Sequence, residues 1–340
     1  MMGFKLVGLI LSYTIGVEAQ ASSGNGSYSL VDTYQGSSFF DKWSFFNAPD
    51  PTHGFVDYVD ASDAASMGLI NATDGAPVYI GTDSTNVVGS EGRPSVRIES
   101  TATYSSGLFL LSLEHQPTGC GTWPAFWLLG PDPWPLNGEV DVIEGVDKQE
   151  TVSSTLHTTE GCDQSGESTD LFSGSWNPGA DSTSPADNCD VDAEGQWGNQ
   201  GCSIAGPSAS MGTSFNAGGG GTYATEFDPA SHISMWFWPK GQEPSDLASE
   251  NPDPGSWGLP YAYFTLSDDT CPSAHFQDLH MIFNVAFCGD WDGDVYAQDC
   301  SSEIAEQGWP ATCDDFVANY PQEFSEAYWL IDYIKVYSKY

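Results

Sequence analysis

Residues 137 to 146 read Asn-Gly-Glu-Val-Asp-Val-Ile-Glu-Gly-Val, an apolar, β-prone run that carries three carboxylates. Side chains alternate between the two faces of a strand, so Glu139 and Asp141 share one face. Strict alternation would send Glu144 to the opposite face. One extra residue, absorbed by a β-bulge near Val142 and Ile143, returns Glu144 to the face of the other two acids. The run therefore predicts a bulged strand with three acids on one surface.

Two carboxyl groups about 5 to 5.5 Å apart on one surface are the equipment for retaining hydrolysis of a glycosidic bond. One attacks as a nucleophile and the other moves a proton, and clustered carboxylates separate their pKa values by mutual repulsion. The alternatives are a calcium site or a solvated acidic face, because acids on strands are usually exposed. Calcium normally takes six to eight oxygens from a loop, whereas this run has alternating valines. The pattern therefore favours catalysis.

The segment 138–144 resembles the bulged Glu-x-Asp-x-x-Glu signature of the laminarinase branch of family 16 glycoside hydrolases. Related plant-wall transglycosylases and bacterial lichenases typically carry the unbulged Glu-x-Asp-x-Glu form, so the count favours β-1,3-glucanases. Fungal laminarinase sequence is also similar to the segments 38–43, 121–127, 287–291 and 329–337. The resemblance covers nearly the whole chain after residue 19.

This resemblance implies a catalytic role for each acid. Glu139 would be the nucleophile, Glu144 the acid/base that protonates the leaving oxygen and later deprotonates water, and Asp141 the modulator of their charges. The chemistry needs no cofactor and no metal. The implied substrate is a β-glucan such as laminarin or lichenan.

Sugar-binding residues follow from the same resemblance, because glucose rings present C–H faces that pack on aromatic planes. Trp127 and Trp134 flank the turn before the catalytic strand and match positions that contact sugar. His157 matches a histidine near the acid/base, where it would bind substrate or tune Glu144, with a structural histidine as the alternative. Arg97 matches a residue that reaches a sugar hydroxyl, and a buried ion pair is the alternative.

Other aromatic and acidic residues receive weaker expectations. Trp123 is expected to pack in the core. Trp236, Trp238 and Trp257 are candidates for distal sugar subsites, and Glu226 resembles a family position at the cleft edge.

The net charge of −39, from 47 acids against eight Lys and Arg residues, repels phosphate backbones and anionic membranes. We therefore expect neither nucleic acid nor a membrane as a partner. Acidity alone can accompany disorder, but 40% apolar and 13% aromatic residues supply a core. A neutral polysaccharide suffers no such repulsion.

The first residues are typical of a secretion signal: one positive charge, an apolar stretch at 6–17, and small residues before position 20. We expect residues 1–19 to be removed and a monomeric, extracellular chain to remain. Eight cysteines then indicate up to four disulfides, with 105 possible pairings. No two cysteines have the short spacing of a zinc site. Asn25 and Asn71 begin N-glycosylation sequons.

The fold class that fits is all-β, a two-sheet antiparallel β-sandwich of jelly-roll type with an open substrate cleft on the concave face, its topology implied by the family. Residues 159–222, rich in Gly, Ser and Asp, are expected to form long loops stapled by disulfides, and no linker divides residues 20–340, so one catalytic domain is expected. Strand-like runs recur at 95–99, 107–114, 138–143, 232–238, 261–266, 280–285 and 327–337.

Two other functions stay open. A glucan-binding protein would share the fold, although such proteins usually lack the catalytic carboxylates. A cell-wall transglycosylase would use the same covalent intermediate and pass it to another sugar.

Overall fold

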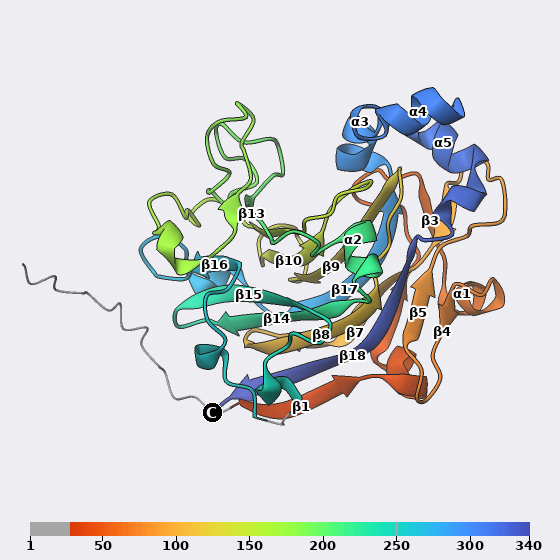
Figure 1. Ribbon diagram of the computed structural model, residues 1–340. Helices are drawn as coiled ribbons and strands as arrows, with labels where there is room; N and C mark the ends of the chain where they lie inside the picture. Colours follow the sequence, from red (N-terminus) through yellow and green to blue (C-terminus); the bar gives the residue numbers. More distant parts are fainter. Residues whose placement is uncertain (1–27, 249–250) are drawn as a thin grey trace, which may run out of the picture.

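Strands dominate the chain and form two large antiparallel sheets, drawn in Figure 1. The structure is a computed structural model that describes residues 28–248 and 251–340. The expected secretion signal at 1–19 and the sequon at Asn25 lie outside the described residues. The predicted fold class, a two-sheet antiparallel β-sandwich, is confirmed.

Sheet A joins strands from both ends of the chain. Its order is β16 (Ala262–Thr265), β15 (His232–Pro239), β14 (Gly221–Asp228), β8 (Gly107–His115), β18 (Tyr328–Lys339), β5 (Val78–Gly81) and β4 (Ile70–Asn71), with β1 (Tyr28–Tyr34) also paired to β18.

Sheet B contains the strand with the three acids near its middle. Its order is β12 (Ser175–Trp176), β13 (Cys202–Ala205), β11 (Ser153–His157), β10 (Glu139–Glu144), β9 (Thr122–Leu129), β17 (Leu279–Phe287), β7 (Arg97–Tyr104) and β2 (Trp43–Phe46). A short parallel pair, β3 (Val56–Tyr58) and β6 (Arg93–Ser95), stands apart.

The main core fills the space between the two sheets. Alternate residues of β10 and β9, such as Val140 and Phe126, are almost fully buried, and they belong to the same apolar cluster as Phe109 and Tyr223 of sheet A. Burial of these side chains is the main stabilising contribution, at roughly 25 cal/mol per Å² of apolar surface. The residues between them on β9 and β10 therefore face away from sheet A.

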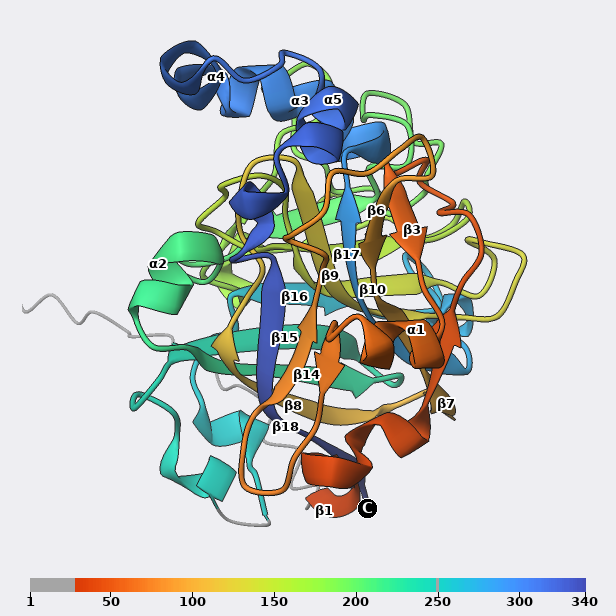
Figure 2. The ribbon, with the colours of Figure 1, turned by 90° about the vertical axis from the view of Figure 1, so that its right-hand side faces the viewer.

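Helices are short. The α-helices are α1 (Ala61–Ser66), α2 (Gly212–Ala217), α3 (Gly289–Asp299), α4 (Ser301–Gln307) and α5 (Cys313–Asn319); the 3-10 turns are η1 (Gly36–Lys42), η2 (Thr169–Leu171), η3 (Ser245–Ala248), η4 (Pro254–Ser256), η5 (Ser273–His275) and η6 (Pro321–Phe324). Figures 1 and 2 show α3, α4 and α5 together at one end of sheet B. Within the described ranges, no helix is long and apolar enough to cross a membrane.

All eight cysteines are paired, which confirms the expectation of up to four disulfides. The bonds are Cys120–Cys300, Cys162–Cys271, Cys189–Cys202 and Cys288–Cys313. Two of them staple residues 159–222, which form long loops with only brief regular elements, as the sequence predicted. The other two attach the helices at 289–319 to the rest of the chain. The sequence did not predict these helices.

Candidate active site

The predicted β-bulge is present in β10. Asp141 pairs with Trp127 of β9, and Ile143 pairs with Phe126, so one residue of β10 is left over between them. Glu144 then pairs with Ala125, two positions from Trp127 and hence on the same face. Glu139, Asp141 and Glu144 thus share one face of sheet B, which we call the acid-bearing face.

Two tryptophan side chains hydrogen-bond the outer acids. Trp134 Nε1 donates to Glu139 Oε2 at 2.7 Å, and Trp123 Nε1 donates to Glu144 Oε1 at 2.9 Å. Trp134 lies in the loop between β9 and β10 and is 40% exposed. Each indole fixes one oxygen of its glutamate and leaves the other oxygen available.

Trp123 was expected in the core, and that expectation was wrong. On β9 it shares a face with Ala125 and Trp127, so strand alternation places it beside the acids rather than between the sheets. The same alternation in the sequence contained the signal that would have found it.

His157 of β11 is paired in register with Glu139. Its Nε2 lies 3.0 Å from Asp141 Oδ2 and 3.8 Å from Glu139 Oε1. Gly201, at φ +61°, passes so close that a Cβ there would lie 2.9 Å from His157 Nδ1. The histidine is thus held against Asp141 and Glu139 rather than against Glu144.

Burial raises the pKa of each of the three acids to about 8. Repulsion from Asp141 adds to the effect on Glu139 and Glu144, whereas His157 and the two indole N–H groups lower the pKa of those glutamates. Three acids this close lose their protons in coupled steps. Asp141 is only 2% exposed, so the acids do not form a solvated acidic face.

Side chains of the two strands β17 and β7 hold Trp127 in place. Its Nε1 donates to Asn284 Oδ1 of β17 at 2.8 Å, and Asn284 Nδ2 donates to Tyr58. Arg97 of β7 stacks on the Trp127 ring at 4.9 Å and on Phe46 at 4.4 Å. Asn284 was missed from the sequence, although a lone amide in a buried apolar strand was a usable signal.

Arg97 also forms an ion pair, with Nη2 2.9 Å from Glu99 Oε1. This is the alternative that the sequence left open for Arg97. Its guanidinium thereby supports the plane of Trp127 from the side of β7.

Four weaker candidates lie elsewhere. Trp236 and Glu226 point from sheet A away from the main core. Trp236 belongs to a second apolar cluster, and Trp238 and Trp257 pack against that cluster. Glu226 lies in ion-pair distance of His232 and Lys339. The expectations of distal subsites and of a cleft-edge acid were wrong, because alternation within a strand does not show which sheet the strand joins.

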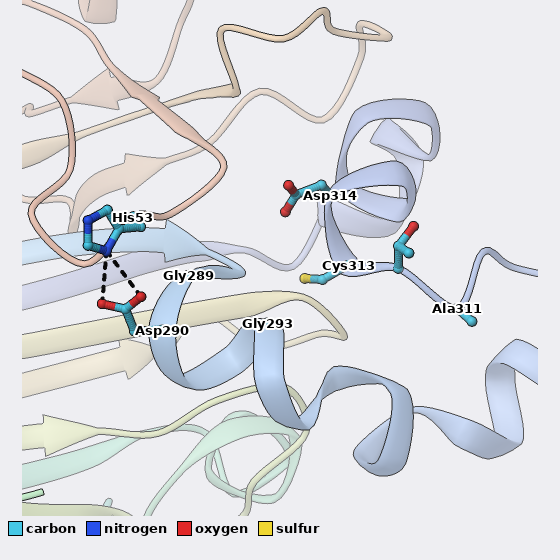
Figure 3. Close-up of a pocket in the computed structure, with 8 residues that line it drawn as sticks. His53, Gly289, Asp290, Gly293, Ala311, Cys313 and Asp314 are labelled. Atoms are coloured by element: carbon cyan, nitrogen blue, oxygen red, sulfur yellow. Dashed lines mark hydrogen bonds and ion pairs between the residues drawn. The ribbon is translucent and has the colours of Figure 1, made fainter. Parts of the chain in front are cut away.

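Surface hollows are also found away from the acids. A pocket of about 430 Å³ lies where α3 and α5 approach His53, and Figure 3 shows the exposed His53 ring directed at the Asp290 carboxylate, 3.0 Å away. A pocket of about 690 Å³ is lined by residues of η1 together with Glu114 and Asp332. The three acids line neither pocket.

Comparison with known proteins identifies similar sequences and structures. The family model described as "XgeA-like, catalytic GH16 domain" matches residues 43–337. An endo-1,3(4)-β-glucanase of Arthroderma benhamiae is 41% identical over 329 residues, which cover 94% of this chain and 67% of that protein. The chain therefore spans about two thirds of that relative's length.

Two solved structures are similar throughout their length. Laminarinase 16A from Phanerochaete chrysosporium, solved with 6-O-glucosyl-laminaritriose in donor and acceptor sites, is 38% identical with a TM-score of 0.81. An elongating family 16 β-1,3-glucosyltransferase is 39% identical with a TM-score of 0.80. Each comparison covers 92% of this chain and 100% of the other.

Proposed function

The chain belongs to glycoside hydrolase family 16, and from that membership we propose that it is a secreted endo-β-glucanase that cuts β-1,3-glucans and mixed β-1,3/1,4-glucans with retention of configuration. The observation that carries the proposal is the bulged β10, which brings Glu139, Asp141 and Glu144 to one face. Retention requires two carboxyls about 5 to 5.5 Å apart, and Glu139 and Glu144 are the pair that we propose for this role.

In the first step, a free oxygen of Glu139 attacks the anomeric carbon and the glycosidic bond breaks. Glu144 gives its proton to the leaving oxygen, so the departing sugar leaves with a hydroxyl group. Trp134 and Trp123 each hold one carboxyl oxygen, which fixes the direction of the oxygen that reacts.

In the second step, water replaces the departed sugar. Glu144, now ionised, takes a proton from this water. The water oxygen attacks the anomeric carbon at the same time and displaces Glu139. The β configuration is restored and both glutamates return to their starting states.

The two glutamates need opposite protonation states before the first step. A raised pKa suits Glu144 as an acid near neutral pH. Burial raises the pKa of Glu139 to about 8 as well, and the Trp134 N–H bond and the nearby His157 act against this, toward the ionised form that attack needs. Asp141, between His157 and both glutamates, would adjust this balance, which is the role we propose for it.

Substrate recognition would come from the aromatic side chains of the acid-bearing face. We propose that Trp127 and Trp134 stack on glucose rings, with His157 and Arg97 as polar neighbours. The names of the relatives, an endo-1,3(4)-β-glucanase and a laminarinase, support laminarin and lichenan as substrates.

Secretion remains part of the proposal. Its support is the signal-like sequence at 1–19 and the four disulfides, which are typical of oxidising compartments. We propose one monomeric catalytic domain over 20–340, with the exposed Asn71 as a glycan site. Mass spectrometry of protein recovered from the medium tests both: a start near Gln20 and a glycan on Asn71 are expected, whereas an intact residue 1 would contradict secretion by cleavage.

The decisive test is an NMR time course with laminarin that records the first anomer formed before mutarotation. The β anomer is expected. A first α anomer would refute double displacement, and bound but uncut laminarin would show a glucan-binding protein instead. Glu139→Ser should abolish turnover in a folded protein, and near-parental cleavage by that variant would refute the nucleophile assignment.

A second candidate function is transglycosylation, favoured by the structural similarity to an elongating β-1,3-glucosyltransferase. The same Glu139 intermediate would then pass to a sugar hydroxyl rather than to water. Mass spectrometry of laminarihexaose digests distinguishes the two outcomes. Products longer than the starting oligosaccharide at high acceptor concentration would establish transfer, and shorter products alone would exclude it.

A further inference from the structure

Two buried acids, Asp147 and Asp292, meet beside the disulfides that attach α3. They are 4% and 0% exposed. Asp147 Oδ1 accepts the Gly121 N–H at 2.8 Å, and Asp292 Oδ2 accepts the Cys288 N–H at 2.8 Å. The remaining oxygens, Asp147 Oδ2 and Asp292 Oδ1, are buried and receive no N–H or hydroxyl donor. Each carboxyl thus has one satisfied oxygen and one that lacks a donor.

The two unsatisfied oxygens can satisfy each other only if one carboxyl carries a proton. The two carboxyls bond neighbouring backbone groups, since the Cys288 N–H also donates to Gly121 O at 3.3 Å, and they interact with each other. Ionised carboxylates are acceptors only, so a hydrogen bond between the two needs a proton on one of them. Burial raises the pKa of Asp147 to about 6 and that of Asp292 well above its usual range. Asp299 raises both pKa values further, Lys148 lowers that of Asp147, and Tyr296 also faces both acids.

This pair connects α3 to the candidate catalytic residues. The Asp147 N–H donates to Thr122 O at 2.9 Å, and the next residue, Trp123, hydrogen-bonds Glu144. On α3, Trp291 precedes Asp292 and packs edge-on against Trp123, with ring centroids 5.7 Å apart. The helix therefore reaches Trp123 both directly and through the acid pair.

We propose that a proton shared between Asp147 and Asp292 clamps α3 to the start of β9 and so positions Trp123 against Glu144. The stability part of this inference stands alone, whereas the positioning part rests on the proposed function. Loss of the shared proton at high pH would leave two negative charges buried together. Because both acids bind protons more tightly in the folded chain, their contribution to stability falls as pH rises above the ordinary Asp pKa.

Asparagine substitution tests the shared proton. In Asp292→Asn, the amide oxygen still accepts the Cys288 N–H and the amide NH₂ donates permanently to Asp147; Asp147→Asn reverses the roles. Each single variant should match the parent Tm at pH 5 and exceed it by about 2–4 °C at pH 8.5. The double variant places two NH₂ groups face to face, so its Tm should fall below that of both single variants.

Asp294→Asn is the matched control, because Asp294 is an exposed acid on the same helix. It should leave the difference in Tm between the two pH values unchanged. Additive effects in the double variant, or single variants less stable than the parent at both pH values, would overturn the shared proton. A fall in parental Tm on adding EDTA would overturn it in favour of a bound cation.

The positioning role is measured separately, by the pH profile of kcat/KM on laminarin. Asp292→Asn keeps the clamp closed at high pH, so the Trp123 N–H stays on Glu144, where it lowers the pKa of that acid. The alkaline limb of the variant's profile should therefore lie at lower pH than that of the parent, in which the clamp opens. An unmoved limb together with the expected Tm pattern would overturn positioning alone. Failure of the parent to hydrolyse laminarin would refute the proposed function and leave the Tm test intact.

Discussion

Replacing Trp123 by Phe tests the least expected contact in the site. The change removes the N–H that reaches Glu144 Oε1 at 2.9 Å and keeps an aromatic ring. That hydrogen bond lowers the pKa of Glu144, so its loss should raise the pKa. Because Glu144 must be protonated for the first step, the alkaline limb of the kcat/KM profile should move to higher pH.

The magnitude follows from the strength of the bond. A hydrogen bond to a charged group contributes about 1.5–3 kcal/mol, and one pKa unit corresponds to about 1.36 kcal/mol. Half-burial of Trp123 places the effect at the lower end, so we expect a shift of about 1 pH unit. Release of the fixed carboxyl should also lower kcat/KM at the optimum by about tenfold. Initial rates on laminarin from pH 3 to 10 give both quantities.

Trp134→Phe is the matched comparison, because it removes the donor to Glu139. Glu139 must be ionised to attack, so this variant should move the acidic limb upward and leave the alkaline limb in place. Trp238→Phe, in sheet A away from the acids, should move neither limb. Movement of the same limb in the Trp123 and Trp134 variants, or of none, would refute the assignment of the two glutamates.

Three further predictions concern charge, support and crosslinking. Asp141→Asn should increase the free energy of unfolding by about 1–3 kcal/mol at pH 8 and leave it unchanged near pH 3. The reason is that a folded pKa near 8 makes the ionised acid costly above its unfolded pKa. Urea titrations at both pH values check this, and equal gains at the two pH values would contradict it. Arg97→Lys should raise KM for laminarin about fivefold with little change in kcat, since lysine loses the stacking on Trp127; a fall in kcat alone would argue against support of binding. Replacing Cys189 and Cys202 together by Ser should cost about 3 kcal/mol in chemical denaturation for a closed loop of this size, and a change under 1 kcal/mol would indicate that the loop is held by other contacts.

The spacing of the acids was enough to predict the bulge. Three acids at 139, 141 and 144 share a face only if one residue is absorbed, and the structure places the irregularity between Asp141 and Ile143. The all-β class was also predictable, because the strand-like runs alternate between apolar and polar residues, whereas the two-sheet topology was implied by the family resemblance. The bulge and the all-β class depend on local periodicity, which the sequence displays directly.

Other features depend on partners that are distant in the chain. The outward direction of Trp236 and Glu226 is set by which sheet β15 and β14 join. The helices at 289–319 lack a clear apolar stripe, and disulfides to Cys120 and Cys288 hold them in place. The acid pair of Asp147 and Asp292 joins residues 145 positions apart, a contact that no local pattern indicates.

The bulge in β10 also determines how this motif tolerates changes in length. Deletion of Val142 would leave Glu-Val-Asp-Ile-Glu, in which ordinary alternation already places the three acids on one face. Insertion of one residue at the same point would require a second irregularity. A single-codon deletion therefore converts this form of the motif to the unbulged form of related enzymes without turning a carboxylate into the core. The strand thus tolerates the loss of one residue at this point better than the gain of one.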